Sequence, residues 1–409
     1  MSTAASTAAP ERIDAPTAAR LAVLAAATFV YVTFEVFPIG LIHDIAADLE
    51  VGVGQVGLLV SGYAVVAGAV TIPAVALAAR VSRGSALVVS LLVLLGAELL
   101  TATATDFATM VAGRVAAALT HGVLWSLIAP AAATMVPRER VGTATAAVFG
   151  GSSLAAIMGS PGTTFVGELI GWRATALLLA VVTAAVTLAL VWALRPPLPV
   201  DPVVPPGARA RRAEPAGGSG TVDWPAVLTL CAVAVVLVVA HFLSYTYFAL
   251  IVAEVTGAPG SVTVLLAVFG IAGAVGTYLM GRHNDRAPRR AAQVTMAAFT
   301  AGVGLLALSL VPAPAAVSWA ALGVAVAVWG GAFAAAGPVF QTGVMRLAGA
   351  QADRASSVYV TGFQVGIAGG SGIGAALLGH SVGVLPPVSA VLAGAVLIAV
   401  LVRRPVPDS

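Results

Sequence analysis

Long apolar stretches alternate with short polar segments along the whole chain. A bilayer core about 30 Å thick needs about 20 apolar residues per helix, and the stretches between charged, proline and glycine positions reach this length. Because a helix satisfies its own backbone hydrogen bonds in lipid, the pattern predicts an all-α integral membrane protein. Twelve transmembrane helices are expected, at residues 21–42, 54–79, 85–104, 107–131, 141–165, 172–194, 225–252, 260–281, 291–311, 315–341, 355–379 and 386–402.

Three segments fall outside this pattern. Residues 1–19 are small and polar with no secretory signal, which indicates a disordered tail, and 405–409 form a second tail. Residues 195–224 contain several prolines and a glycine-rich run, which is typical of a linker. The linker divides the chain into two six-helix bundles, at 20–194 and 225–404, as in transporters built from repeats.

Charge supports the membrane interpretation and orients the chain. Only 9% of the 409 residues are charged, against about 25% in soluble proteins, which excludes a soluble enzyme. All 20 basic residues are arginines, and 18 of them, all except Arg114 and Arg173, fall in loops on one predicted side. Since cytoplasmic loops keep the positive charge, both termini and the linker are expected to be cytoplasmic. The arginines form no basic face, so no nucleic-acid partner is expected.

One short motif is specific. Residues 281–290 read Gly-x-x-x-Asp-Arg-x-x-Arg-Arg. With the twelve spans, this motif resembles the cytoplasmic loop signature of the major facilitator superfamily, and the resemblance covers nearly all of residues 20–404. It implies that the loop controls conformational change through Gly281, Asp285, Arg286, Arg289 and Arg290. The first copy of the motif, at 79–85, lacks the aspartate.

Within the superfamily the chain is most similar to the bacterial sugar efflux group of the drug:proton antiporters. The similarity lies in residues 34–41, 44–46, 121–126 and 171–173, and in Gly159, Pro161 and Gly167 of the antiporter signature helix. It implies a proton-coupled secondary efflux transporter that works by alternating access in the bacterial inner membrane. Its energy source would be the proton gradient, with no bound cofactor or metal, and we expect a monomer.

Few charges lie inside the predicted spans, where each one is costly and calls for a partner or a function. Glu35 and Arg114 both lie about seven residues from the outer end of their helices, roughly 10 Å deep, and are expected to pair. A carboxyl group whose surroundings differ between two states can carry a proton, so Glu35, Arg114 and His241 are the proton-coupling candidates. The alternative is a purely structural ion pair. Glu98 is expected to reach the outer interface.

Polar and aromatic residues follow two helix faces. Arg114, His121 and Trp125 share one face of the fourth helix, and His241, Ser244 and Tyr245 share one face of the seventh. Such faces suit an uncharged, partly apolar ligand in a central cavity. The candidate substrate-binding residues are Tyr31, His121, Trp125, Ser244, Tyr245, Trp329, Phe333, Gln341 and Gln364. Packing between helices is the alternative for each of them.

The expected solute is a sugar or a sugar-like compound, with an amphenicol, another drug or a nucleoside as alternatives. A membrane enzyme is disfavoured because the sequence has neither H-E-x-x-H nor G-x-S-x-G. A channel is disfavoured because no segment resembles a selectivity filter. The single cysteine, Cys231, leaves no disulfide to form.

Overall fold

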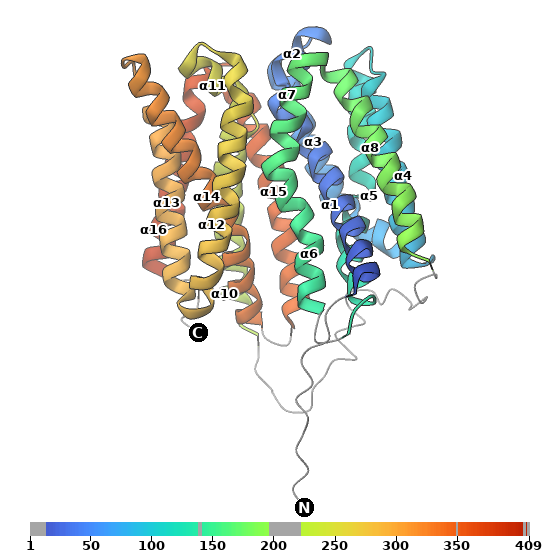
Figure 1. Ribbon diagram of the computed structural model, residues 1–409. Coiled ribbons are helices and arrows are strands. Elements are labelled where there is room, and N and C mark those ends of the chain that lie inside the picture. The colour runs from blue at the N-terminus through green and yellow to red at the C-terminus, as the bar shows by residue number, and fades with distance from the viewer. Residues whose placement is uncertain (1–13, 138–140, 196–221, 349–350, 404–405, 407–409) are drawn as a thin grey trace, which may run out of the picture.

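The computed structural model describes residues 14–137, 141–195, 222–348, 351–403 and 406 (Figure 1). This described part is helical and contains no strand. Up to residue 195 the elements are α1 (Ala15–Gly40), α2 (Ile42–Asp48), α3 (Val53–Ala78), α4 (Arg83–Ala102), α5 (Phe107–Ala133), α6 (Val141–Leu154), the π-helix η2 (Ala155–Gly159), α7 (Ser160–Ile170) and α8 (Trp172–Ala193). From residue 222 they are α10 (Trp224–Tyr245), α11 (Phe248–Thr256), η3 (Pro259–Ser261), α12 (Val262–Arg286), α13 (Pro288–Leu308), α14 (Ala315–Ala348), α15 (Ala352–Leu377), η5 (Val382–Val384) and α16 (Leu385–Arg403).

The all-α prediction is confirmed. In the described residues, 11 helices are long and apolar enough to cross a membrane. The predicted span at 141–165 is not among them, because it consists of three consecutive elements, α6, η2 and α7. The count of twelve crossings and their grouping into two bundles stay predictions.

The π-helix has a local cause. Pro161 has no backbone N–H and its ring crowds the carbonyl group four residues earlier, so the regular hydrogen-bond pattern is interrupted there. A single π turn just before the proline accommodates the change, and such turns often occur at functional sites. A Cβ atom on Gly270 of α12 would overlap the backbone of Ala156 and Ile157. The π segment therefore lies in direct contact with α12.

The predicted span at 225–252 is broken. α10 ends at Tyr245 and α11 begins at Phe248, although neither glycine nor proline stands between them. The Oγ1 atom of Thr246 lies 2.8 Å from Oγ of Ser371, and the Tyr247 hydroxyl donates to the Ser371 carbonyl at 2.8 Å. These bonds to α15 turn the chain, so tertiary contacts rather than local sequence cause the break.

Two helices begin earlier than expected. Residues 15–19, expected in the tail, belong to α1, because Asp14 accepts a hydrogen bond from the backbone N–H of Thr17 and Pro16 fits the first turn. α10 begins at Trp224, inside the expected linker, where Asp223 caps the backbone N–H of Ala226. Most of the remaining tail and linker residues lie outside the described part.

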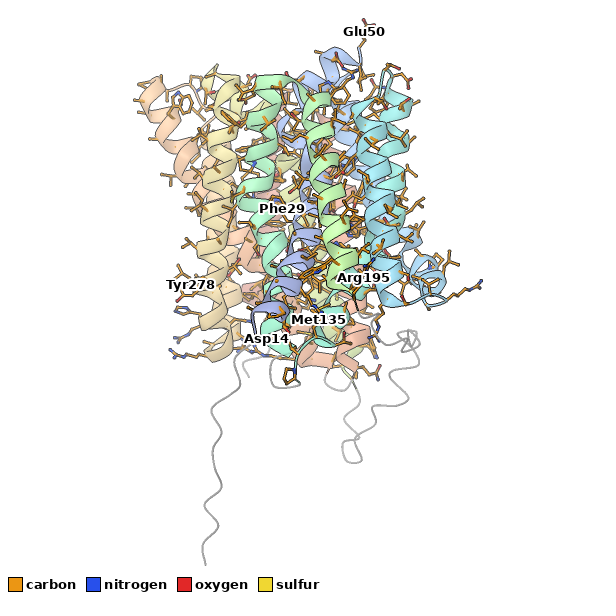
Figure 2. All side chains as sticks on the ribbon, turned by 45° about the vertical axis from the view of Figure 1, so that its right-hand side comes forward. Asp14, Phe29, Glu50, Met135, Arg195 and Tyr278 are labelled. Atoms are coloured by element: carbon orange, nitrogen blue, oxygen red, sulfur yellow. The ribbon has the colours of Figure 1, made fainter. Side chains whose placement is uncertain are left out.

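Helices from before and after residue 196 lie side by side. α15 packs along α3 and α10, and α12 packs along α14, α7 and η2. In Figure 1 α2 and α11 lie at the upper end of the bundle, and Figure 2 shows Glu50 at that end. Asp14, Met135 and Arg195 lie at the opposite end. We refer to the α2 and α11 end as the outer end, following the arginine distribution; its orientation in the membrane stays a prediction.

Candidate functional site

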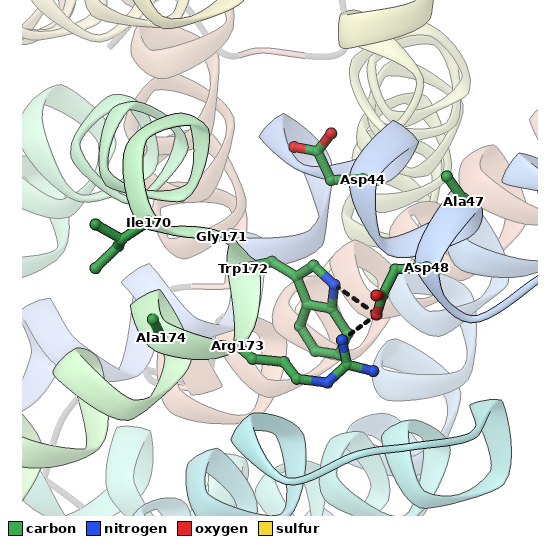
Figure 3. Close-up of a pocket in the computed structure, with 8 residues that line it drawn as sticks. All are labelled: Asp44, Ala47, Asp48, Ile170, Gly171, Trp172, Arg173 and Ala174. Atoms are coloured by element: carbon green, nitrogen blue, oxygen red, sulfur yellow. Dashed lines mark hydrogen bonds and ion pairs between the residues drawn. The ribbon is translucent and has the colours of Figure 1, made fainter.

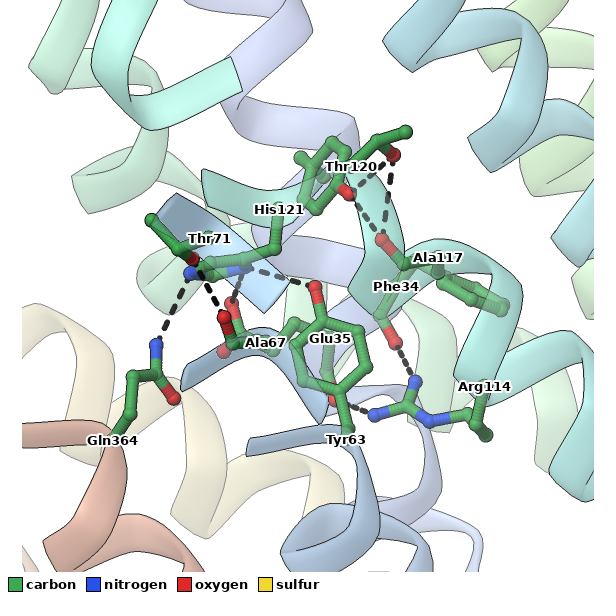
Figure 4. Close-up of polar contacts among 11 residues, drawn as sticks. Phe34, Glu35, Tyr63, Ala67, Thr71, Arg114, Ala117, Thr120, His121 and Gln364 are labelled. Carbon is green, nitrogen blue, oxygen red and sulfur yellow. Dashed lines mark hydrogen bonds and ion pairs between the residues drawn. The ribbon is translucent and has the colours of Figure 1, made fainter. Parts of the chain in front are cut away.

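The guanidinium of Arg114 holds α1 to α5. It is 2% exposed and donates hydrogen bonds to the backbone carbonyls of Phe34 and Glu35, both at 2.6 Å (Figure 4). In a regular helix the Phe34 carbonyl would accept from the residue four positions later, but this is Pro38, which has no N–H. Arg114 therefore satisfies an acceptor that Pro38 leaves open. Its guanidinium carbon also lies 5.2 Å from the Phe34 ring centroid and 4.8 Å from that of Tyr63.

The expected ion pair between the Glu35 and Arg114 side chains is not formed. Arg114 binds the backbone of α1, and among the described residues the group facing the Glu35 carboxylate is His121, whose Nδ1 lies 3.9 Å from Oε2. The depth of each residue along its helix correctly places Glu35 near Arg114. Depth does not identify the acceptor of the Arg114 guanidinium, because the backbone carbonyl that Pro38 leaves open competes with the carboxylate.

His121 connects Glu35 to α15, which belongs to the part of the chain after residue 222. Its Nδ1 lies 2.9 Å from the Tyr63 hydroxyl, and its Nε2 lies 3.1 Å from the amide nitrogen of Gln364 on α15 (Figure 4). If the amide donates to Nε2, a neutral His121 carries its hydrogen on Nδ1, facing Tyr63 and Glu35. The Oε1 atom of Gln364 is buried and has no partner in the described part of the chain. We call Glu35, Tyr63, His121 and Gln364 the polar network.

Tyr31 of α1 lies beside this network, with its ring centroid 5.8 Å from that of His121. Its hydroxyl donates to the Ala117 carbonyl and lies 3.0 Å from the Thr120 hydroxyl. Tyr63 is not among the residues predicted from the sequence. It has the same feature that identified Tyr31, because it is a polar aromatic residue inside an apolar span. Trp125 stacks on Phe149 of α6, with ring centroids 5.5 Å apart, and lies 6.1 Å from His121.

Four of the candidates after residue 222, namely His241, Tyr245, Trp329 and Phe333, belong to an aromatic cluster. His241 of α10 stacks on Phe333 of α14, with ring centroids 3.3 Å apart and planes within 5°, and on Tyr245 at 4.8 Å. Trp329 lies 5.2 Å from His241. We call the following rings the aromatic cluster: His241, Phe242, Tyr245, Phe248, Phe269, Phe299, Trp329 and Phe333.

Two further substrate candidates, Ser244 and Gln341, are not members of either group as defined here. Ser244 is fully buried and its hydroxyl lies 2.7 Å from that of Ser389 on α16, which is a helix-packing contact. Gln341 is half-buried farther along α14. Glu98 does not reach the outer interface as expected: it is fully buried, and its Oε1 accepts a hydrogen bond from Thr183 of α8 at 2.9 Å.

The motif at 281–290 is helical on both sides of Ala287, where α12 gives way to α13. Arg286 and Arg290 are exposed, and Arg289 donates to the Val406 carbonyl at 3.4 Å. The side chains of Gly281 and Asp285 lie outside the described residues. The role of this loop in conformational change stays a prediction.

The glycines of the expected antiporter signature lie against α1. A Cβ atom on Gly159 would overlap Thr33, and one on Gly167 would overlap Leu41. Pro161 lies between them, directly after the π segment. Their small size therefore permits η2 and α7 to pack closely on α1 and on Leu41, which directly follows α1.

A separate pocket of about 590 Å³ lies at the outer ends of α2 and α8 (Figure 3). There the Asp48 carboxylate pairs with Arg173 and accepts a hydrogen bond from Trp172 Nε1 at 3.2 Å. Arg173 also donates to the Ala104 carbonyl at 2.8 Å. The lining of the pocket includes no residue of the polar network, and we interpret its ion pair as a clasp between the outer ends of α2 and α8.

Membrane-length helices that enclose a buried polar network, contributed by segments on both sides of residue 196, define a polytopic membrane carrier. The family model of the Major Facilitator Superfamily matches residues 23–371. The chain belongs to the Major Facilitator Superfamily. It is a multi-pass membrane transporter and not an enzyme.

Relatives and solved structures agree with this assignment. A chloramphenicol efflux pump of Mycobacterium tuberculosis (strain ATCC 25618 / H37Rv) is 38% identical over 390 residues, which cover 95% of this chain and 92% of that protein. A probable sugar efflux transporter of Mannheimia succiniciproducens is 29% identical over 364 residues, covering 88% of this chain and 87% of that protein. The crystal structure of a nucleoside transporter superposes with a TM-score of 0.74 at 11% identity, covering 94% of this chain and 99% of that one, and shares the fold alone. The expected resemblance to efflux transporters of the drug:proton antiporter type is confirmed.

Proposed function

We propose that this chain exports a small neutral solute in exchange for protons, by alternating access between two six-helix bundles. The observation that carries the proposal is the polar network, in which the Glu35 carboxylate faces His121, and His121 in turn contacts Gln364 of α15. An ionised carboxylate only accepts hydrogen bonds, whereas a protonated one also donates. A change of protonation at Glu35 therefore alters a chain of contacts that joins the two halves.

Alternating access is supported by where the two halves touch. Ser61 of α3 donates to the Ala368 carbonyl of α15 at 2.9 Å, and Thr263 of α12 donates to Glu168 of α7 at 3.2 Å. Tyr247 packs directly against Gly57 of α3. These contacts lie in the outer parts of the helices. We assign the structure to a state that is closed at its outer end.

Two solute classes fit. An amphenicol is favoured by the aromatic cluster and by the similarity to a chloramphenicol efflux pump. A sugar is the second candidate, because the polar network offers hydroxyl, imidazole and amide groups and because a relative is named as a probable sugar efflux transporter.

The test is Glu35→Gln in proteoliposomes that contain purified full-length protein. The amide cannot carry the proton, so export against a concentration gradient should stop. Substrate binding, and exchange of substrate down its own gradient, should persist because neither needs net proton movement.

Glu98→Gln is the matched control. Glu98 is also a buried carboxyl of the first half, but it contacts Thr183 rather than the network, so this variant should retain proton-driven export. Uphill export by Glu35→Gln protein would show that Glu35 is structural, and His241 would become the next candidate.

A further inference from the structure

One ring pair in the aromatic cluster differs from the others. Aromatic pairs prefer offset or edge-to-face arrangements with centroids about 4.5–7 Å apart, and the other His241 pairs lie between 4.8 and 6.5 Å. Phe333 instead lies flat over His241, with centroids 3.3 Å apart and planes within 5°. Phe333 is half-buried, whereas His241 is 1% exposed. The phenyl ring of Phe333 is therefore a cover over the imidazole.

Two buried polar atoms on the imidazole and on a neighbouring ring have no partner in the described part of the chain. They are Nδ1 of His241 and Nε1 of Trp329, on rings whose centroids are 5.2 Å apart. Native proteins rarely leave buried polar atoms unpaired, because each loses its bonds to water. Except for Tyr245, the rings that contact His241 and Trp329 from outside this pair are phenyl rings, so a partner that carries an apolar body fits this place.

We propose that Phe333 stands in for an aromatic ring of the transported solute. When Phe333 turns away, that ring stacks on His241, and an acceptor oxygen of the solute takes the hydrogen bond of Trp329 Nε1. The solute class is a neutral compound with a planar ring that carries an acceptor, such as a nitroaromatic alcohol. This inference rests on the proposed export function and specifies its substrate class.

We infer that the other end of such a solute reaches α15. The Phe333 ring lies 6.2 Å from that of Phe363 on α15, and the next residue, Gln364, holds the unpartnered Oε1 atom. A hydroxyl or amide group of the solute can donate to this oxygen. A sugar fits this place less well, because each hydroxyl buried among phenyl rings without a partner is costly.

The test measures binding of 4-nitrobenzyl alcohol to purified full-length protein by calorimetry. Phe333→Ala removes the competing ring, so the Kd should fall about two- to tenfold, the equivalent of one aromatic stack. Phe333→Trp keeps a larger flat ring over His241 and should raise the Kd. Trp329→Phe keeps the ring but loses the donor and should also raise the Kd.

Phe363→Ala is the control, because it removes a phenyl ring of the same site that does not cover His241; it should not tighten binding. Unchanged or weaker binding by Phe333→Ala protein with an unaltered melting temperature overturns the inference. Tighter binding by Phe333→Trp protein also overturns the inference. This variant leaves no cavity, so it provides a test even if Phe333→Ala protein is destabilised.

These results separate the inference from the function on which it rests. Binding is measured without a gradient, so the expected Kd pattern together with absent proton-driven export contradicts the export function alone. Proton-driven export of a nitroaromatic with no effect of Phe333 on affinity contradicts the inference alone.

Discussion

Gly57 of α3 gives a direct test of the outer closure. A Cβ atom at this position would overlap the ring and the hydroxyl of Tyr247. Tyr247 has no room to retreat, because its hydroxyl is bonded to the Ser371 carbonyl and its ring lies against Gly374 of α15. Gly57→Ala should therefore strain the state that is closed at the outer end and leave a state with separated halves unstrained.

The magnitude follows from the packing. Adding a methyl group to a filled site costs about 1–3 kcal/mol. Only strain that differs between two states shifts their ratio, and here all of it falls on the closed state. The ratio should move toward the outward-open state by about 5- to 150-fold.

The assay is labelling of Ala375→Cys on α15, in a Cys231→Ser background, by an impermeant thiol reagent added from outside. Residue 375 faces Gly54 in the closed state, so Gly57→Ala should speed its labelling. Gly62→Ala is the matched control, since a Cβ atom there meets nothing within 4 Å. Combining Gly57→Ala with Tyr247→Ala should restore slow labelling, as expected for a steric coupling. Equal labelling of the Gly57→Ala and parent proteins would refute the proposed closure.

Three further predictions concern single contacts. Arg114→Lys should lower the melting temperature and slow transport, because one ammonium group cannot reproduce the fork that holds the Phe34 and Glu35 carbonyls; an unchanged melting temperature would contradict this role. Asp48→Asn should cost at most about 1 kcal/mol in an unfolding titration, since its pair with Arg173 is partly exposed; a larger loss would make the clasp more than a surface contact. Asp285→Asn should slow transport while solute affinity, measured by calorimetry, stays within a few fold; an unchanged rate would leave its loop with a topological role only.

The fold was largely predictable from the sequence because lipid imposes one rule on every span. The predicted span 54–79 corresponds to α3, Val53–Ala78, and 172–194 corresponds to α8, Trp172–Ala193. The break at Tyr247 was not predictable, because the cause is a pair of bonds to α15 rather than a local glycine or proline. The π segment had a visible sign in Pro161, but hydropathy does not separate a π turn from an α turn.

The sequence predicts many of the residues that form the site, but it does not predict which of them contact one another. Helical spacing selected His121, and depth selected Glu35 and Arg114. The actual partner of Arg114 depends on a carbonyl that Pro38 leaves open, so a backbone group took the place expected for a carboxylate. Cross-helix contacts such as the one between His121 and Gln364 depend on how the halves meet, which no local pattern contains.

The two proposals meet at α15, and this connection suggests how solute and proton are coupled. Gln364 contacts His121 of the polar network, and its neighbour Phe363 contacts Phe333 of the aromatic cluster. A solute that draws the Gln364 side chain to itself weakens its contact with His121, and so changes the surroundings of Glu35. Because linkage between two binding events is reciprocal, a solute that lowers the proton affinity of the network by some factor has its own affinity lowered by the same factor on protonation. Coupling of the two ligands then needs no direct contact between solute and Glu35, only a shift of the Gln364 side chain when its Oε1 atom accepts from the solute.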